Sequence, residues 1–348
     1  TNVAPVPVID VRDHRFGAGG SWDVPESAFT EPEPPTGDTD IKRIVATVTQ
    51  ANQQAGLPEP MRPWLPELAP TYRLDQLPTK RTDAEMVFGV IDRPDEQLQP
   101  VVSFVPDRDG NMAIFGTGGS GKSTMLRSLA IAAGFSSARG GPCHVYALDF
   151  GTRGLAMLEP LPHVGAVITG DDTERTMRLL RHLRALIDDR ARRYAEVNAA
   201  TVQEYRERAG RTEEPRILLL IDNFGAFRQA YELNFQARAY ELLEGIAADG
   251  RSVGVHLIAT ADQSGAFTAS FNSVIQSKLA LRLSSEMDFT VLGVPQDVFS
   301  ETTPPGRGYM DDSEVQVAVI GGEPSVAKQA AEIAKLIKAM ERAGVPTA

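Results

Sequence analysis

Cysteine is almost absent from this 348-residue sequence, in which Cys143 is the single example. One cysteine excludes an intramolecular disulfide framework and any zinc site built from cysteines. The sequence also lacks an apolar run of the ~18 residues that a membrane span needs, and it lacks a charged and then apolar leader. We therefore expect a soluble segment of a longer protein in a reducing compartment, with any membrane anchor lying elsewhere in the parent.

Basic residues are fewer than acidic residues in this sequence. The sequence has 35 Lys and Arg against 46 Asp and Glu, a formal net charge of -11. Broad binding to nucleic acid requires clustered Lys and Arg that replace counterions on the phosphates. The charge balance therefore disfavours nucleic acid as a partner.

The sequence predicts four segments along the chain. Residues 1–37 are rich in proline and glycine and are typical of an extended linker. Residues 38–83 contain a predicted amphipathic helix over 39–55 and then an extended stretch, which we expect to wrap a domain surface. Residues 84–322 form the predicted main domain, and 323–348 a C-terminal helix and a boundary.

From about residue 84, short apolar runs alternate with longer helical stretches. This alternation is typical of an α/β fold with a mostly parallel sheet and crossover helices. The candidate strands lie at 86–91, 101–105, 112–115, 144–150, 216–221, 256–260, 279–283 and 315–320. The candidate helices lie at 122–133, 172–198, 234–249 and 324–342.

A phosphate-binding motif stands between a predicted strand and a predicted helix. It fits G-x-x-x-x-G-K-[S/T] and consists of Gly116, Thr117, Gly118, Gly119, Ser120, Gly121, Lys122, Ser123 and Thr124. The glycines allow successive backbone N–H groups to point at phosphate oxygens, and the start of the helix adds its positive end. We expect Lys122 to bridge the β- and γ-phosphates of ATP and Ser123 to bind Mg²⁺.

A second element of the predicted site is an acidic residue that follows the apolar run at 217–221. Asp222 is predicted to orient the magnesium ion, and the next residue, Asn223, stands where efficient P-loop motors place a glutamate that activates water. Asparagine cannot accept a proton, so we expect nucleotide binding with slow or absent hydrolysis. A substituting carboxylate remains an alternative, with Asp149 and Asp262 as the candidates.

Several further motifs resemble the FtsK/SpoIIIE ATPases and, within them, the EccC/EssC proteins of type VII secretion. They are Leu-Asp-Phe-Gly at 148–151, Leu-Pro-His-Val-Gly at 161–165, Ile-Asp-Asn-Phe at 221–224, the stretch 250–260 and Pro-Gly-Arg-Gly at 305–308. The resemblance covers about residues 60–322. The elements at 161–165 and 89–94 are more similar to the second of the three usual ATPase modules than to the first.

This resemblance implies a P-loop NTPase with a RecA-like sheet that binds ATP and Mg²⁺. It further implies neighbouring ATPase modules in the same chain, a homo-hexamer of the full-length protein, a WXG100-type secretion substrate and a place on the cytoplasmic side of a membrane-anchored complex. DNA-pumping members have Asp-Glu at 222–223 and Ala-Thr-Gln at 259–261, where this sequence has Asp-Asn and Ala-Thr-Ala. Both departures favour a degenerate module that regulates or scaffolds the motor. In such a module a hydrophobic groove would receive either a linker of the parent chain or the C-terminal tail of an exported substrate.

The resemblance also suggests roles for three arginines. Arg251 and Arg190 are candidates for an arginine finger that reaches an adjacent ATP, although the arginine-rich run over 175–193 is also typical of a solvated helix face. Arg307 is a candidate for a loop that closes over the nucleotide base, with a solvent-facing turn as the alternative.

Two other function classes stay open. An active DNA translocase of the FtsK or conjugative coupling class would need a working water-activating carboxylate and a basic surface. A small-molecule P-loop kinase would need an acceptor pocket and an arginine-rich lid. His163 and His256 lack a second ligand at metal spacing and are expected to be packed residues.

Overall fold

The computed structural model describes residues 39–56, 65–80, 82–135, 141–232, 237–300 and 302–348, and the chain divides into two units, 1–62 and 63–348. The predicted linker over 1–37 lies outside the described residues. In the first unit, α1 (Asp40–Ala55) begins after Thr39, whose side chain accepts a hydrogen bond from the Lys42 N–H, and it ends at Gly56 with φ +62°. The helix predicted over 39–55 is confirmed.

The second unit is built on one ten-stranded sheet in the order β2-β1-β10-β9-β8-β3-β7-β6-β4-β5. The six strands from β8 to β5 are parallel, and the four from β2 to β9 pair antiparallel. The strands are β1 (Met86–Ile91), β2 (Val101–Phe104), β3 (Met112–Phe115), β4 (Cys143–Asp149), β5 (Val164–Thr169), β6 (Arg216–Asp222), β7 (Val255–Ala261), β8 (Ser277–Leu281), β9 (Arg307–Met310) and β10 (Ser313–Val317). The predicted α/β fold is confirmed.

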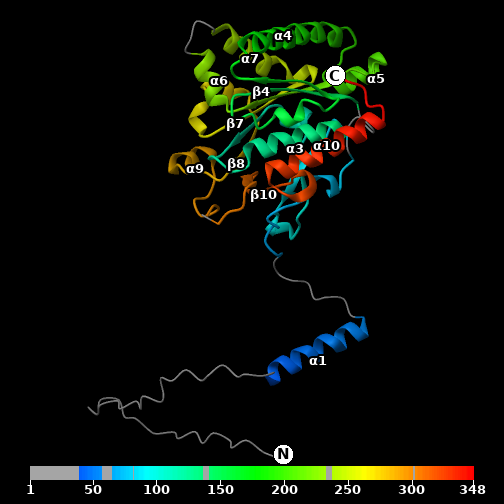
Figure 1. The fold of residues 1–348 in the computed structure, drawn as a ribbon, viewed down its shortest axis with the longest axis vertical. Helices are drawn as coiled ribbons and strands as arrows, with labels where there is room; N and C mark the ends of the chain where they lie inside the picture. The colour runs from blue at the N-terminus through cyan, green and yellow to red at the C-terminus, as the bar shows by residue number, and fades with distance from the viewer. Residues whose placement is uncertain (1–38, 57–64, 81, 136–140, 233–236, 301) are drawn as a thin grey trace, which may run out of the picture. The chain divides into compact units, whose positions relative to one another are not determined.

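Helices cover both faces of this sheet (Figure 1). The buried residues of α3 and α10 share one hydrophobic cluster, and those of α4, α6 and α7 belong to a second cluster on the other face. The helices are α2 (Pro106–Asp109), α3 (Lys122–Phe135), α4 (Thr173–Glu196), α5 (Val202–Ala209), α6 (Phe224–Tyr231), α7 (Ala237–Asp249), α8 (Ala269–Val274), α9 (Glu286–Leu292) and α10 (Val326–Arg342). The central strands are therefore apolar on both sides, as expected for a parallel sheet.

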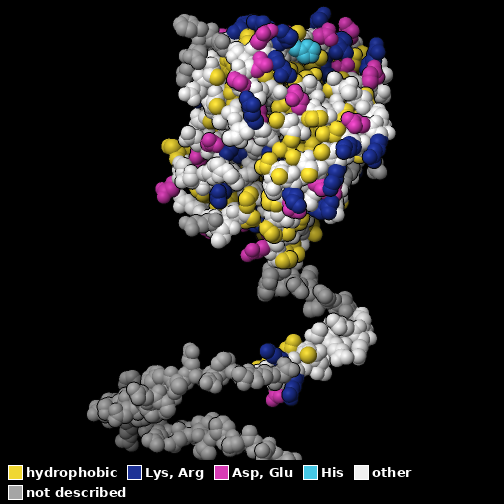
Figure 2. Space-filling model, in the orientation of Figure 1, with side chains coloured by type: hydrophobic (Ala, Val, Ile, Leu, Met, Phe, Trp, Pro, Cys, Tyr) yellow, Lys and Arg dark blue, Asp and Glu magenta, His cyan; other side chains and the backbone are white. Residues whose placement is uncertain are grey.

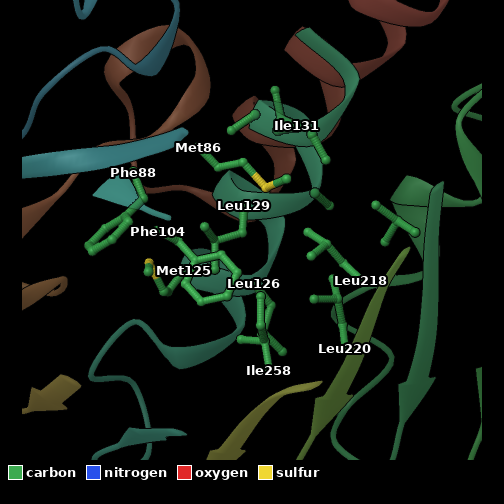
Figure 3. Close-up of a cluster of buried hydrophobic side chains, with 14 of the residues drawn as sticks. Met86, Phe88, Phe104, Met125, Leu126, Leu129, Ile131, Leu218, Leu220 and Ile258 are labelled. Carbon is green, nitrogen blue, oxygen red and sulfur yellow. The ribbon is translucent and has the colours of Figure 1, made fainter. Parts of the chain in front are cut away.

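The core beneath α3 holds the phosphate-binding helix in place. Met125, Leu126 and Leu129 of α3 are fully buried and pack toward Leu218, Leu220 and Ile258 of the central strands (Figure 3). Burial of side chains of this size contributes roughly 1.5–3 kcal/mol each. The P-loop thus leads into a helix that its apolar side chains fix on the sheet.

Two strands, β5 and β9, were not predicted from the sequence. β5 contains Gly165 and lies at the edge of the sheet, and β9 is a short Arg-Gly-Tyr-Met stretch beside a hairpin turn. Neither has the unbroken apolar run by which the central strands were recognised. β5 is stabilised by pairing with β4, and β9 by pairing with β8 and β10, and a single strand's local pattern does not reveal such pairing.

The stretch that precedes the predicted domain boundary at residue 84 belongs to the same compact unit as the sheet. Leu68 and Leu74 are buried, and the Leu74 N–H donates to the Val319 carbonyl at 2.9 Å. The extended segment at 65–80 therefore contributes to the core of the second unit.

The described helices include none that is both long enough and apolar enough to cross a membrane. On the face shown in Figure 2, Lys and Arg side chains are interspersed with Asp and Glu. This face therefore has no continuous basic surface of the kind that tracks a phosphate backbone.

His163 is buried and its Nε2 lies 2.8 Å from the Ala130 carbonyl. Burial lowers the pKa of His163 to about 4. Its folded-state pKa is thus below the unfolded value of about 6.5, so the unfolded chain binds a proton that the folded chain does not. The stability that neutral His163 contributes is complete above about pH 6.5 and is lost as the pH falls toward 4.

We therefore expect His163→Gln to be less sensitive to acid than the wild type. The free energy of unfolding, measured by urea titration at pH 7 and pH 4.5, should fall between these values by about 2 kcal/mol more in the wild type than in the variant. Equal losses in both proteins would show that His163 is not the group that takes up the proton.

Candidate nucleotide site

The P-loop joins the end of β3 to the start of α3, and two neighbouring strands fix it. The Gly116 N–H donates to the Ala261 carbonyl at 3.1 Å, and the Thr117 N–H donates to the Arg282 carbonyl at 2.9 Å. Gly121 has φ +112°, and a Cβ there would lie 2.8 Å from the Gly306 nitrogen. Glycine is required at 121 both by the backbone conformation and by this close approach.

Lys122 is the first residue of α3, and its ammonium group faces the loop that precedes it. Its Nζ donates to the Gly116 carbonyl at 2.6 Å and the Thr117 carbonyl at 2.9 Å, and lies 2.9 Å from a carboxylate oxygen of Asp262. The lysine side chain is mostly buried, while that of Asp262 is 66% exposed. The Lys122 ammonium group is therefore held between the P-loop backbone and Asp262.

Ser123 and Asp222 lie side by side at the predicted metal position. The Ser123 hydroxyl donates to Asp222 Oδ2 at 2.6 Å, and the Thr260 hydroxyl donates to Asp222 Oδ1 at 2.7 Å. The Asp222 residue is 3% exposed at the end of β6. Mg²⁺ prefers hard oxygen ligands such as hydroxyl and carboxylate groups, and in P-loop proteins nucleotide phosphates and water complete its coordination shell. Ser123 and Asp222 therefore fit the predicted metal site.

Asn223 is fixed in an unusual conformation next to this pair. It has φ +64° and ψ +69°, and its backbone N–H donates to the Thr260 hydroxyl at 2.8 Å. Its side-chain oxygen accepts the Ala226 N–H at 3.2 Å and so caps helix α6. The amide at the predicted water-activating position thus serves as a helix cap.

Asp149 lies opposite Asp222 in the register of β4 and β6. One carboxylate oxygen accepts the Gly151 N–H at 3.1 Å, and the other accepts the Leu155 N–H at 2.9 Å. Burial raises the pKa of Asp149 above its ordinary value, the hydrogen bond from Leu155 opposes the rise, and the nearby Asp222 adds to it. Asp149 therefore shapes the loop after β4, with both oxygens already bound.

A cavity of ≈ 540 Å³ opens beside the P-loop. Lys122, Ser123 and Thr124 line one side, and the loop at 152–154 lines another. The remaining wall is more apolar and comes from the distant C-terminal part of the chain, with Pro305, Gly306, Val317, Val319, Pro324, Ser325 and Val326. The phosphate-binding side and the apolar wall together suit a nucleotide, whose base needs a largely apolar surface.

Sequence reasoning missed Arg127, which also lines this cavity. Its guanidinium donates to the Thr124 hydroxyl at 2.8 Å, the Gly154 carbonyl at 3.0 Å and Gln329 Oε1 at 2.9 Å. It therefore ties α3 to the loop after β4 and to α10. A charged residue within an otherwise apolar helix was the available signal.

The structure corrects the expectation that Arg307 closes over the base. Arg307 lies in β9 and is 9% exposed, and its guanidinium donates to Gln316 at 3.0 Å and the Leu68 carbonyl at 2.6 Å. It also pairs with Glu314 at 3.1 Å. The two residues before it, Pro305 and Gly306, line the cavity instead, and the Gly306 N–H donates to the Ser120 carbonyl at 2.8 Å.

Arg190 is not placed to act as an arginine finger. It is fully buried in α4, where it donates to the Val253 carbonyl at 2.9 Å and the Pro215 carbonyl at 2.7 Å and pairs with Glu214 at 2.7 Å. Such an arginine cannot reach a neighbouring subunit without leaving the core, so this expectation was wrong.

Arg251 is exposed and precedes β7, so it lies at the opposite end of the parallel strands from the P-loop. Its Nη2 donates to the Asp107 carbonyl at 2.9 Å. Its role as a finger toward another subunit stays a prediction.

The aromatic residues after Asp222 form a packing face. Phe224, Phe227 and Tyr231 are buried, and Phe224 stacks on Phe267 with ring centroids 4.4 Å apart. Their contribution is to fix α6, and with it Asn223, against the sheet.

The family model described as FtsK/SpoIIIE matches residues 74–298. The chain belongs to the FtsK/SpoIIIE family. Membership accounts for the order of motifs along the chain and implies nucleotide binding, which is generally magnesium-dependent in P-loop ATPases. The expected resemblance to the EccC/EssC group is also confirmed, because relatives of this FtsK/SpoIIIE domain carry those names.

One curated relative is the type VII secretion system protein EssC of Staphylococcus aureus (strain MRSA252), 24% identical over 276 residues, covering 76% of this chain and 18% of EssC. The cytoplasmic domain of the Thermomonospora curvata type VII secretion ATPase EccC is 29% identical with TM-score 0.69, covering 84% of this chain and 36% of that one. EccC ATPases 2 and 3 from the same organism, solved with a signal sequence peptide, are 29% identical with TM-score 0.64, covering 83% and 52%. The FtsK/SpoIIIE domain thus spans about a fifth of EssC.

Proposed function

We propose that this chain is an ATP-binding module of a type VII secretion motor that turns ATP over slowly or not at all. One observation carries the proposal: Asp222 accepts a hydrogen bond from Ser123, while the adjacent Asn223 caps α6. In this proposal Ser123 and Asp222 bind the magnesium ion, and the residue at the position of the proton acceptor is an amide, which cannot take a proton from water.

In this proposal the module is most similar to the second ATPase of an EccC/EssC chain. Support comes from the likeness to a structure of EccC ATPases 2 and 3 and from the motifs at 89–94 and 161–165. Bound ATP and Mg²⁺ fix the loops around the cavity and thereby regulate or scaffold contacts with neighbouring modules, in a homo-hexamer on the cytoplasmic side of the membrane. Docking of a substrate tail of the WXG100 type, or of a linker, belongs to the same proposal, because that relative was solved with a signal sequence peptide.

The active-translocase alternative requires a carboxylate that replaces the missing glutamate. Both oxygens of Asp149 are bound by the loop backbone, and an oxygen of Asp262 is bound by Lys122. The net charge of -11 disfavours DNA as a substrate. The observations therefore favour the regulatory module.

The first experiment measures nucleotide and phosphate on the purified chain. Denaturing it and quantifying the released nucleotide should show bound ATP or ADP, and phosphate release with added ATP and Mg²⁺ should stay near the level without protein. Brisk release that disappears with Lys122→Ala would overturn the proposal and favour the translocase.

Lys122→Ala is expected to weaken ATP binding by roughly 10- to 100-fold, because charge-assisted hydrogen bonds contribute about 1.5–3 kcal/mol. Titration of a fluorescent ATP analogue in the presence of Mg²⁺ measures the change. Lys278→Ala, which removes a lysine of β8 whose side chain is exposed, is the control and should bind like the wild type. Unchanged affinity in Lys122→Ala would place the nucleotide elsewhere.

A further inference from the structure

Asp262 follows β7 directly, at the point where the sheet brings the P-loop and the metal site together. β7 lies between β3, which leads into the P-loop, and β6, which ends at Asp222. The Gly116 N–H bonds to the Ala261 carbonyl, so the residue after Ala261 is fixed beside the P-loop. Two residues further on, the Ser264 N–H and hydroxyl both donate to the buried Asp288, at 2.8 and 2.6 Å. The loop that carries Asp262 is therefore anchored on both sides.

The Asp262 carboxylate lies 2.9 Å from Lys122 Nζ, which also donates to the Gly116 and Thr117 carbonyls. Two N–H donors of the ammonium group thus bind the P-loop carbonyls, and Asp262 adds an ion pair at 2.9 Å. A phosphate oxygen that binds Lys122 must therefore replace a partner. The exposed Asp262 side chain is the easiest to displace, because the two carbonyls belong to the P-loop backbone itself.

We infer that Asp262 is a specificity-determining residue that competes with the terminal phosphate of the nucleotide for Lys122 and thereby shifts the preference of the site from ATP toward ADP. The inference rests on the proposed nucleotide binding. A terminal phosphate held between Lys122 and a magnesium ion at Ser123 and Asp222 lies next to the end of β7, so the carboxylate of Asp262 faces it with like charge. ADP brings only its β-phosphate to Lys122 and lacks the γ-phosphate, so it meets less of this repulsion than ATP does.

Removing the charge should therefore favour ATP. Asp262→Asn is expected to tighten the binding of a non-hydrolysable ATP analogue by roughly fivefold and to change the affinity for ADP by less than about twofold. A fivefold change is the effect expected from two like charges several ångströms apart at a partly exposed site. The gain should shrink at high salt, because 66% of the Asp262 side chain is exposed and ions screen it.

The test is calorimetric titration of the whole chain with the ATP analogue and with ADP, each with Mg²⁺, at low and high salt. Asp262→Glu keeps the charge and should retain the wild-type preference. Asp95→Asn is a control for the change in net charge, because it removes an exposed carboxylate on the antiparallel side of the sheet, and it should bind both nucleotides like the wild type. Equal changes for both nucleotides, or none, would overturn the inference.

Phosphate release separates this role from a chemical one. If Asp262→Asn left both affinities unchanged and abolished phosphate release, Asp262 would be the substitute base, and the inference would be wrong. If the wild type bound neither nucleotide, the proposed function itself would fail. Binding of both nucleotides with no discrimination by Asp262→Asn would refute this inference alone.

Discussion

Asn223→Glu should convert the chain into a measurable ATPase, with phosphate release raised by about 100-fold over the wild type. A positioned general base contributes roughly 10²- to 10⁴-fold, and the lower end is expected here because the surrounding residues are adjusted to an amide. In the proposed function Lys122 binds phosphate and Ser123 and Asp222 bind the metal ion, so a carboxylate is the missing part.

Asn223→Asp is the matched control for this experiment. An aspartate has the length of the native side chain, tolerates the left-handed backbone at φ +64° and is a good helix cap, so its carboxylate should stay on the Ala226 N–H. We therefore expect a gain below about tenfold for Asn223→Asp, well short of the general-base range. Steady-state phosphate release with Mg²⁺ and ATP, with Lys122→Ala as the blank, measures both variants.

The glutamate also has a structural cost. It loses the cap on α6 and sits in the left-handed region, and together these changes should lower the free energy of unfolding by about 2 kcal/mol. Thermal unfolding of both variants checks this loss. If folded Asn223→Glu released no more phosphate than the wild type, the low turnover would have a cause other than the missing carboxylate.

Arg216→Met should lower the free energy of unfolding by about 3–5 kcal/mol, since removing one partner of a buried ion pair leaves charge uncompensated. Arg216 is fully buried at the start of β6. It binds both carboxylate oxygens of Asp107 at 2.7 and 2.9 Å, and its Nε lies 3.3 Å from Asp83. Asp83 also binds Arg206 of α5 at 2.7 Å.

His256 completes this network as a neutral ring. Burial, then the positive charge of Arg216, lowers the pKa of His256 to about 3. The ring therefore accepts from Arg216 at Nε2, 3.0 Å away, and donates from Nδ1 to the Gly110 carbonyl at 2.9 Å. Loss of Arg216 would leave His256 Nε2 and the Asp107 carboxylate without this donor, while Asp83 would keep only Arg206 as its charged partner.

Arg178→Met is the control for the Arg216 experiment. Arg178 pairs with Glu174 at 2.7 Å, but its side chain is 75% exposed, and such pairs contribute well under about 1 kcal/mol. Urea unfolding followed by circular dichroism should show a large loss for Arg216→Met and almost none for Arg178→Met. Similar small losses in both would mean that water or protonation compensates the buried carboxylates.

The parts of the site that are local in the chain could be predicted from the sequence alone. The P-loop from Gly116 to Thr124, Asp222 at the end of an apolar strand, and the amide at Asn223 all follow from neighbours within a few residues, because a phosphate cradle is built from consecutive backbone N–H groups. The central strands and long helices were predictable for the same reason, since their apolar periodicity is local.

Which distant residues meet could be seen only in the folded chain. In the sequence, Arg307 and Arg190 cannot be distinguished from arginines that bind a ligand. In the fold, Arg307 donates to the Leu68 carbonyl and Arg190 is buried beside Glu214. The apolar wall at 317–326 and the ion pair between Lys122 and Asp262 likewise join segments far apart in sequence. Strand order depends on the sum of many long-range contacts, and no local pattern records that sum.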